Sequence, residues 1–220
     1  MFQPRLAVVA LLIVLAAVSR LVNLPWNLAP IGALALYCGV YFRNRLVGLS
    51  VPLLAMFASD IGLGLYHQNV SFYAFHQLVP FTYGCFAIYF LLGMTVRQHW
   101  NAVDGASAGK GEVQSSTAAV HQSREGGGHR ARWTKGLSLA ASTVGAGLMF
   151  FLITNVATWL LFPTYAKSVV GLLECFWAAV PFYRSTIAGD VVFVALLFGG
   201  TTLAQQMVPA NVRDRFLQPE

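Results

Sequence analysis

Residues 46–66 read LVGLSVPLLAMFASDIGLGLY, and Asp60 is the only charged residue in this stretch. A hydrocarbon core of about 30 Å needs roughly 20 apolar residues in a helix that rises about 1.5 Å per residue. The stretch therefore predicts a membrane-spanning helix, and it indicates the fold class of the rest of the chain.

Comparable apolar windows recur on both sides of this stretch. The 220 residues are 57% hydrophobic and 10% charged, whereas about a quarter of the residues in a soluble domain are charged. The additional windows are Leu6–Leu24, Ala29–Phe42, Phe72–Val96, Gly136–Phe162 and Thr186–Val208. We therefore expect an all-α integral membrane protein, a bundle of about six transmembrane helices.

Two prolines modify this layout. Pro80 lies inside the window Phe72–Val96 and predicts a kink, because proline removes a backbone donor from the helix. The stretch Gly171–Val180 is apolar but too short to cross, and it carries Glu174. We expect it to form a short outer re-entrant or interfacial helix that ends at Pro181 and serves as a lid.

One long polar stretch divides the chain. Residues 97–135 are rich in Gly, Ser, Ala and His and contain almost no large apolar residue. Such a composition cannot bury a core and is typical of a flexible linker. The expected domains are therefore 1–96 with four transmembrane helices, the cytoplasmic linker 97–135, and 136–220 with two transmembrane helices and the lid segment.

The sequence offers no pattern for a cofactor, a metal or a nucleic acid. The histidines of the linker lack Cys or carboxylate companions at ligand spacing, and Gly105–Gly111 lacks the spacing and the Ser or Thr of a phosphate loop. The basic residues of the linker are diluted by glycine and lack interleaved aromatics. The three cysteines lie in apolar runs, and we interpret them as packing residues.

The basic residues orient the chain. With six spans, eleven of them fall on the side of the linker, and only Arg20, Lys167 and Arg184 fall on the other side. The positive-inside rule then places the linker and both termini in the cytoplasm, in a multi-pass protein of the cell inner (plasma) membrane. If Ala29–Phe42 were re-entrant, the N-terminus would lie outside and Arg20 inside, and the division would again be eleven to three.

Unusual polar residues gather in the outer half of this topology. Charged groups are costly in hydrocarbon, and they normally face the interior of a bundle or a water-filled cavity. The candidate residues for binding a substrate are Arg20, Asn27, Asp60, His76, Asn155, Trp159, Glu174, Arg184 and Asp190. An alternative is internal pairing, in which Asp60 or Asp190 binds Arg20 or Arg184 and Asn155 bonds to a neighbouring helix.

Catalysis is not indicated by these residues. The acidic and histidine side chains could supply acid–base chemistry, but no spacing matches a metalloprotease or a nucleophile elbow. We therefore expect a protein that is not an enzyme.

Several segments resemble an uncharacterised family of small bacterial membrane proteins. The segments that carry the resemblance are Asn27–Leu36, Tyr41–Arg43, Val51–Leu54 with Ser59-Asp60, Phe150–Asn155, Trp159, and Gly171–Phe182 with Gly189-Asp190. That family is in turn similar, in topology and in the placement of polar residues, to the substrate-binding S components of energy-coupling-factor vitamin transporters. Those proteins have six helices, cytoplasmic termini and a ligand pocket that opens outward under capping loops.

The resemblance implies a function and a set of partners. We expect the substrate-capturing subunit of a transporter for a small polar, vitamin-like or zwitterionic solute, working in the lipid bilayer with a coupling membrane subunit and an ATPase. S components commonly dock through an Ala-x-x-x-Ala pattern on the first helix, whereas here Ala29 and Ala33 place it on the second. The alternatives are a non-transporting membrane scaffold or assembly partner and, third, a membrane-embedded enzyme.

Overall fold

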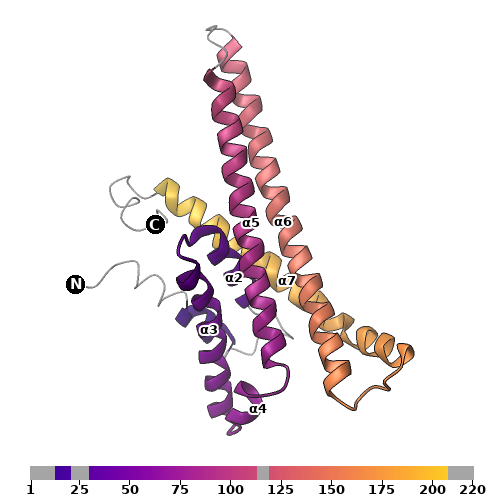
Figure 1. The fold of residues 1–220 in the computed structure, drawn as a ribbon. Coiled ribbons are helices and arrows are strands. Elements are labelled where there is room, and N and C mark those ends of the chain that lie inside the picture. Colours follow the sequence, from indigo (N-terminus) through magenta and orange to yellow (C-terminus); the bar gives the residue numbers. More distant parts are fainter. Residues whose placement is uncertain (1–12, 21–29, 113–118, 208–220) are drawn as a thin grey trace, which may run out of the picture.

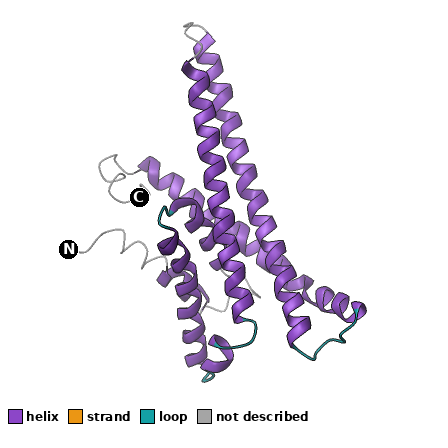
Figure 2. Cartoon of the chain, in the orientation of Figure 1, coloured by secondary structure: helices purple, strands orange, loops and turns teal. Residues whose placement is uncertain are grey.

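The computed structural model describes residues 13–20, 30–112 and 119–207, and these residues form helices and no strand (Figures 1 and 2). Residues 13–20 are helical. The helices that follow are α2 (Ile31–Tyr41), α3 (Arg45–Tyr66), α4 (Val70–Ala74), α5 (Val79–Glu112), α6 (Ala119–Leu161) and α7 (Val169–Met207). The expected all-helical fold is confirmed in this part of the chain.

Four of these helices contain segments long and apolar enough to cross a membrane. The segments are Arg45–Tyr66, Val79–Ala106, His129–Leu161 and Val169–Leu203. They match the predicted third to sixth windows and are consistent with a multi-pass membrane protein. The predicted first window, Leu6–Leu24, lies mostly outside the described residues.

The short helix α2 lies at the centre of the bundle. It contacts α3, α5, α6 and α7, and nine of its 11 residues are buried. At about 1.5 Å per residue it is about 16 Å long, roughly half of a hydrocarbon core. The described helix is therefore too short to cross by itself, whereas the sequence predicted a complete span over Ala29–Phe42. Its apolar residues are explained by burial on all sides rather than by contact with lipid.

The contact between α2 and α5 depends on two glycines. A Cβ atom on Gly39 would overlap the backbone carbonyl oxygen of Phe90, and one on Gly93 would overlap that of Leu36. Small residues let helix backbones approach closely, and this is how helices commonly associate in membranes. The two glycines thus bring α2 against the middle of α5.

The chain breaks where one kinked helix was predicted. The window Phe72–Val96 is divided into α4 and α5, and Pro80 is the second residue of α5. Proline is tolerated in the first turn of a helix, because the N–H it lacks would have no partner there. Pro80 therefore lies at a helix start, and the prediction of a kink inside one helix was wrong.

The segment predicted as a flexible linker is helical where the structure describes it. Beyond the apolar segments, α5 continues to Glu112 and α6 begins at Ala119, and the two run side by side beyond the other helices (Figure 1). The indole nitrogen of Trp100 donates to the Lys135 carbonyl at 3.2 Å and to the Ser138 hydroxyl at 3.0 Å. Lys135 also pairs with Asp104 at 2.6 Å. Each polar segment continues a helix that is already formed, so it avoids the cost of nucleation.

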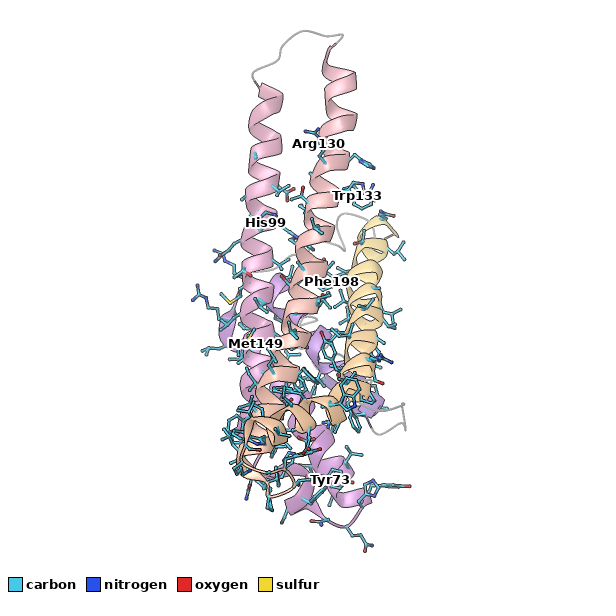
Figure 3. All side chains as sticks on the ribbon, turned by 90° about the vertical axis from the view of Figure 1, so that its right-hand side faces the viewer. Tyr73, His99, Arg130, Trp133, Met149 and Phe198 are labelled. Atoms are coloured by element: carbon cyan, nitrogen blue, oxygen red, sulfur yellow. The ribbon has the colours of Figure 1, made fainter. Side chains whose placement is uncertain are left out.

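These two helical extensions, residues 97–112 and 119–135, are called the α5–α6 hairpin below. His99, Arg130 and Trp133 lie on this hairpin, and Tyr73 lies at the opposite end of the molecule (Figure 3). The two ends of the bundle are thereby defined without reference to a membrane.

The last helix is also longer than predicted. Gly171–Val180 was expected to end at Pro181 as a separate short helix, but α7 runs from Val169 to Met207 with Pro181 inside it. Proline costs a helix one hydrogen bond and a steric clash, and here the helix accommodates it without ending. The separate outer helix is therefore not seen, although residues 171–180 still lie at the end of the bundle opposite the hairpin (Figure 1).

Candidate functional site

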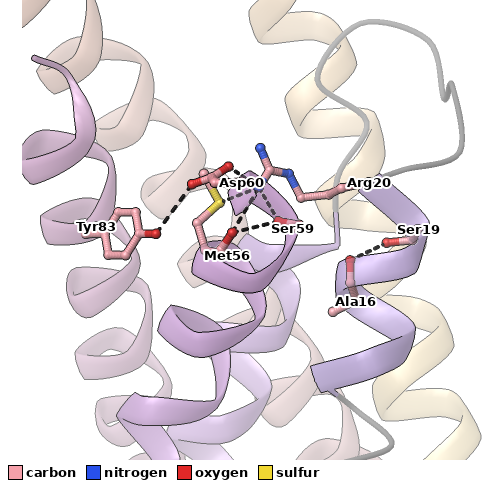
Figure 4. A network of polar contacts seen from close by, with 7 residues as sticks. All are labelled: Ala16, Ser19, Arg20, Met56, Ser59, Asp60 and Tyr83. Atoms are coloured by element: carbon pink, nitrogen blue, oxygen red, sulfur yellow. Dashed lines mark hydrogen bonds and ion pairs between the residues drawn. The ribbon is translucent and has the colours of Figure 1, made fainter. Parts of the chain in front are cut away.

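A buried ion pair joins the helical residues 13–20 to α3 (Figure 4). It lies near Tyr83 at the start of α5, which is the end of α5 opposite the hairpin. Arg20 donates from one guanidinium nitrogen to an Asp60 carboxylate oxygen at 2.7 Å. The same nitrogen contacts the Met56 sulfur at 3.0 Å and the Ser59 hydroxyl. On the other side of the carboxylate, the Tyr83 hydroxyl lies 3.4 Å from the second oxygen. Asp60 thus has a cation and a hydroxyl as partners.

The sequence left two interpretations of these residues open, substrate binding and internal pairing, and this ion pair agrees with internal pairing. The side chains of Arg20 and Asp60 are only 18% and 3% exposed, so each needs the other to offset the cost of leaving water. Internal pairing of Asp60 with Arg20 is therefore confirmed, and the two charges neutralise one another.

A second buried carboxylate lies deeper in the bundle. Asp190 on α7 is 2% exposed, and the Tyr89 hydroxyl on α5 donates to one of its oxygens at 2.7 Å. Arg184, the basic residue that the sequence offered as a partner, is exposed at the surface of α7. Among the described residues, no basic side chain forms an ion pair with Asp190.

Two glycines make room for this carboxylate. A Cβ atom on Gly32 of α2 would lie 2.7 Å from one Asp190 oxygen, and one on Gly147 of α6 would lie 3.6 Å from the other. Asp190 therefore stands where α2, α5, α6 and α7 meet.

The depth of Asp190 differs from the prediction. Tyr89 lies ten residues from Val79, where α5 begins, and eight from Arg97, where the polar part of α5 begins. These intervals are about 15 Å and 12 Å, so the Tyr89 hydroxyl and its partner lie near the middle of the apolar layer. The sequence analysis placed Asp190 in the outer half because the predicted last window began at Thr186, whereas α7 begins at Val169.

A cavity of about 330 Å³ opens between α5, α6 and α7 at the end opposite the hairpin. Its wall combines aromatic and aliphatic side chains with hydroxyl and amide groups, and none of the described residues that line it is charged. The lining residues are Leu78, Thr82, Phe150, Phe151, Thr154, Asn155, Thr158, Ala179, Phe182, Tyr183 and Thr186.

The threonines of the cavity present acceptors. Thr154 donates its hydroxyl hydrogen to the Phe150 carbonyl at 2.7 Å, and Thr158 donates to the Thr154 carbonyl at 2.8 Å. Thr82 donates in the same way to the carbonyl of Leu78, just before α5, and Thr186 to that of Phe182 in α7. Each hydroxyl has used its single hydrogen, so its oxygen is available to accept a bond from a solute.

Of the predicted site residues that the structure describes, Asn155 alone lines the cavity. Its side-chain nitrogen donates to the Phe151 carbonyl of its own helix at 2.7 Å. The Cys175 sulfur lies 3.5 Å from the Asn155 backbone oxygen and links α7 to α6 beside the cavity. The same thiol donates to the Asn155 side-chain oxygen at 4.0 Å. Asn155 therefore bonds within α6 and also to the neighbouring helix α7, as the internal-pairing alternative predicted.

The structure does not bring the remaining predicted residues into this cavity. The Trp159 indole donates to the Ala166 carbonyl at 2.8 Å, and Glu174 is exposed. His76 lies between α4 and α5, where its Nδ1 atom is buried and finds no hydrogen-bond partner among the described residues. Asn27 lies outside the described residues.

Sequence reasoning missed the tyrosines and threonines that complete these sites. Tyr83 and Tyr89 on α5 each give a hydroxyl to a buried aspartate, and Thr154 and Thr158 follow one another along α6 at helical spacing. A usable signal was present, because a tyrosine inside an apolar helix needs a partner for its hydroxyl. No group of three His, Cys, Asp or Glu side chains that could hold a metal occurs in the described part of the chain.

Comparison with known proteins gives one match. No curated protein matches the chain, and no solved structure matches it. The profile of a family of unknown function, DUF6580, matches residues 1–211, which is nearly the whole sequence. The expectation of membership in an uncharacterised family is thereby confirmed, and the chain belongs to the DUF6580 family.

Proposed function

We propose that the protein captures a small uncharged solute in the cavity between α5, α6 and α7, as the substrate-binding subunit of a membrane transporter. The observation that carries this proposal is the chemistry of the cavity wall, which joins aromatic surfaces to four threonine hydroxyls and Asn155. Ligand sites are typically apolar hollows with a few placed polar groups.

The size and polarity of the cavity narrow the solute. A volume of about 330 Å³ lies at the small end of known ligand pockets. The threonine oxygens accept hydrogen bonds, and the Tyr183 hydroxyl can donate as well as accept. A compact, partly aromatic or aliphatic molecule that carries N–H or O–H donors fits this wall.

The ion pair changes the expected charge of the solute. Arg20 and Asp60 bind one another at 2.7 Å, and neither lines the cavity. A zwitterionic solute is therefore unnecessary to balance these charges. We propose a neutral solute, of which an uncharged vitamin or vitamin precursor is an example.

The charge distribution supports capture from the outer side. Both topologies considered for Ala29–Phe42 leave the basic α5–α6 hairpin in the cytoplasm. The cavity lies at the other end of α5 and α6, which is the outer end in either case.

The energy for transport would come from partner proteins. The sequence contains no phosphate loop, so we propose that a coupling membrane subunit and an ATPase supply it. The α5–α6 hairpin offers a helical surface on the cytoplasmic side on which such partners could bind.

A ligand screen on the purified protein tests the proposal. Thermal-shift measurements against uncharged vitamins and their precursors should identify a stabilising compound, and calorimetry should then give its affinity. Thr154→Val and Asn155→Ala should each weaken binding, because each removes an acceptor from the wall. Thr143→Val is the matched control, since Thr143 is buried three turns away on α6 and its hydroxyl bonds to Leu139.

The proposal fails if no compound stabilises the protein, or if the cavity variants bind a stabilising compound as well as Thr143→Val does. A loss of affinity in Thr143→Val alone would also contradict the proposal, because it would place the binding site away from the cavity.

A second candidate function is a membrane scaffold that assembles other proteins. It is favoured by the internal pairing of Arg20 with Asp60 and by the hairpin, which extends beyond the bundle (Figure 1). Co-purification separates the two functions. An ATPase and a coupling subunit would support transport, and a complex without either would support the scaffold.

A further inference from the structure

We propose that Asp190 is a proton-binding site in the middle of the membrane, and that protons reach it from the cavity. The position of the route rests on the proposed function, since it uses the same cavity. The proton site itself rests on the geometry around Asp190 and requires no solute.

The two buried aspartates have different partners. Asp60 has the guanidinium of Arg20 and the hydroxyl of Tyr83, whereas Asp190 has the hydroxyl of Tyr89. An ionised carboxylate in a low-dielectric interior is costly unless a charge offsets it, and the usual outcome is neutralisation by a proton. In the described residues no cation offsets Asp190, so a proton is the species that completes this site.

The groups facing Asp190 are consistent with a proton rather than a metal ion. From α5, Tyr89 donates to it, and Cys85 and the α7 residue Tyr183 lie within electrostatic reach of that hydroxyl. From α2 and α6 the facing residues are Gly32 and Gly147, which bring no titratable group. Tyr37 of α2 bonds to Thr201, about three turns along α7. A hard cation such as Mg²⁺ or Ca²⁺ takes six or more oxygen ligands, and the described residues show one carboxylate and one hydroxyl here.

Each oxygen of the carboxylate has a distinct environment. Tyr89 donates to Oδ2, and Oδ1 faces the space where Gly32 lacks a side chain. Proton binding forms an O–H bond at Oδ1 when a hydronium ion that arrives through the cavity gives up a proton and leaves as water. Release of the proton to water reverses this step. Gly32 leaves the space that this hydrogen needs.

The helices that line the cavity lead directly to Asp190. On α7, Thr186 lines the cavity and Asp190 follows four residues later, which places both on one face of the helix. On α6, Phe150 lines the cavity and Gly147 lies three residues before it. The ring of Phe150, which lines the cavity, lies 5.9 Å from the Phe86 ring, and the Phe86 ring lies 6.2 Å from the Tyr89 ring. A series of neighbouring aromatic rings thus connects the cavity wall to the tyrosine that bonds Asp190.

Infrared difference spectroscopy on the full-length protein in lipid nanodiscs tests the site, with the proton itself as the probe. We expect a protonated-carboxyl band near neutral pH that is lost in Asp190→Asn and retained in Asp60→Asn. Tyr89→Phe should shift the band, because it removes the hydrogen bond to Oδ2. This second variant keeps the test decisive if Asp190→Asn does not fold.

Transfer into D₂O tests the route. Deuterium exchange of the band should be slower in Thr186→Trp, which fills the cavity, than in Thr143→Val. Absence of the band in the wild-type protein, or its survival in Asp190→Asn, overturns the proton site. Equal exchange rates in the two threonine variants overturn the route. A failed ligand screen would leave both measurements standing, so the two proposals can fail separately.

Discussion

Two ion pairs show how burial changes the contribution of a charged residue to stability. Arg20 and Asp60 come from positions 40 residues apart and are nearly enclosed, with exposed fractions of 18% and 3%. Lys135 and Asp104 form a shorter contact at 2.6 Å, but their exposed fractions are 27% and 63%. Water screens the second pair, whereas the first must satisfy its own charges.

Arg20→Met should therefore destabilise the protein strongly. Removing one partner of a buried pair leaves an uncompensated charge and costs about 3–5 kcal/mol. The double variant Arg20→Met with Asp60→Leu should recover part of this loss, because it leaves no charge behind. Thermal unfolding in detergent, followed by circular dichroism, measures both.

The matched control is Lys135→Met, which should cost about 0–1 kcal/mol. An equal loss in Lys135→Met and Arg20→Met, or an additive double variant, would contradict a stabilising buried pair.

At the scale of elements, the sequence identified apolar helices better than it identified their ends. The four long windows were found because a run of about 20 apolar residues is the length that a membrane-spanning helix needs. The ends were missed where a local rule was overridden. Pro181 was expected to end a helix and lies inside α7. Residues 97–135 were expected to form a flexible linker, but residues 97–112 and 119–135 are helical. Continuity with a long formed helix outweighed the local preference in both cases.

Gly93→Ala should separate α2 from α5. The added methyl group would overlap the Leu36 carbonyl, and such overpacking typically costs about 1–3 kcal/mol. Gly84→Ala on the same helix is the matched control, because a Cβ atom there meets nothing within 4 Å. The control should stabilise the helix by about 0.5–1 kcal/mol.

The measurement is the midpoint of thermal unfolding for both variants. A midpoint that falls equally in both, or rises in both, would show that the glycines do not set the distance between α2 and α5.

For the whole molecule, the sequence predicted which parts are apolar but not which helix is innermost. The window Ala29–Phe42 resembled a short span because apolar residues face either lipid or protein, and hydropathy cannot distinguish the two. The candidate site was predicted only in part, because hydropathy does not show which helices are neighbours. Depth along each helix brought Asp60 and Arg20 to one region, but whether they bind each other depends on distances between helices, which a single sequence does not contain.

The orientation of the molecule can be tested with single cysteines. We expect Ala106→Cys, on the hairpin, to react with a membrane-impermeant maleimide only from the cytoplasmic side, and Ser168→Cys, between α6 and α7, only from the outer side. Both positions are exposed, and the native Cys38, Cys85 and Cys175 are buried and should give little background. Labelling of intact cells against inverted vesicles gives the answer, and the reverse pattern would invert the proposed direction of solute capture.

The central position of α2 bears on how the protein is made. Residues 31–41 leave the ribosome early, but their neighbours include α5 and the last helix, to which Tyr37 bonds through Thr201 across 164 positions of sequence. During synthesis α2 must remain near the insertion machinery with part of its surface uncovered, until the C-terminal helix has been translated. A chain interrupted before Thr201 would leave α2 incompletely enclosed, and quality-control proteases should degrade such a chain faster than the finished one.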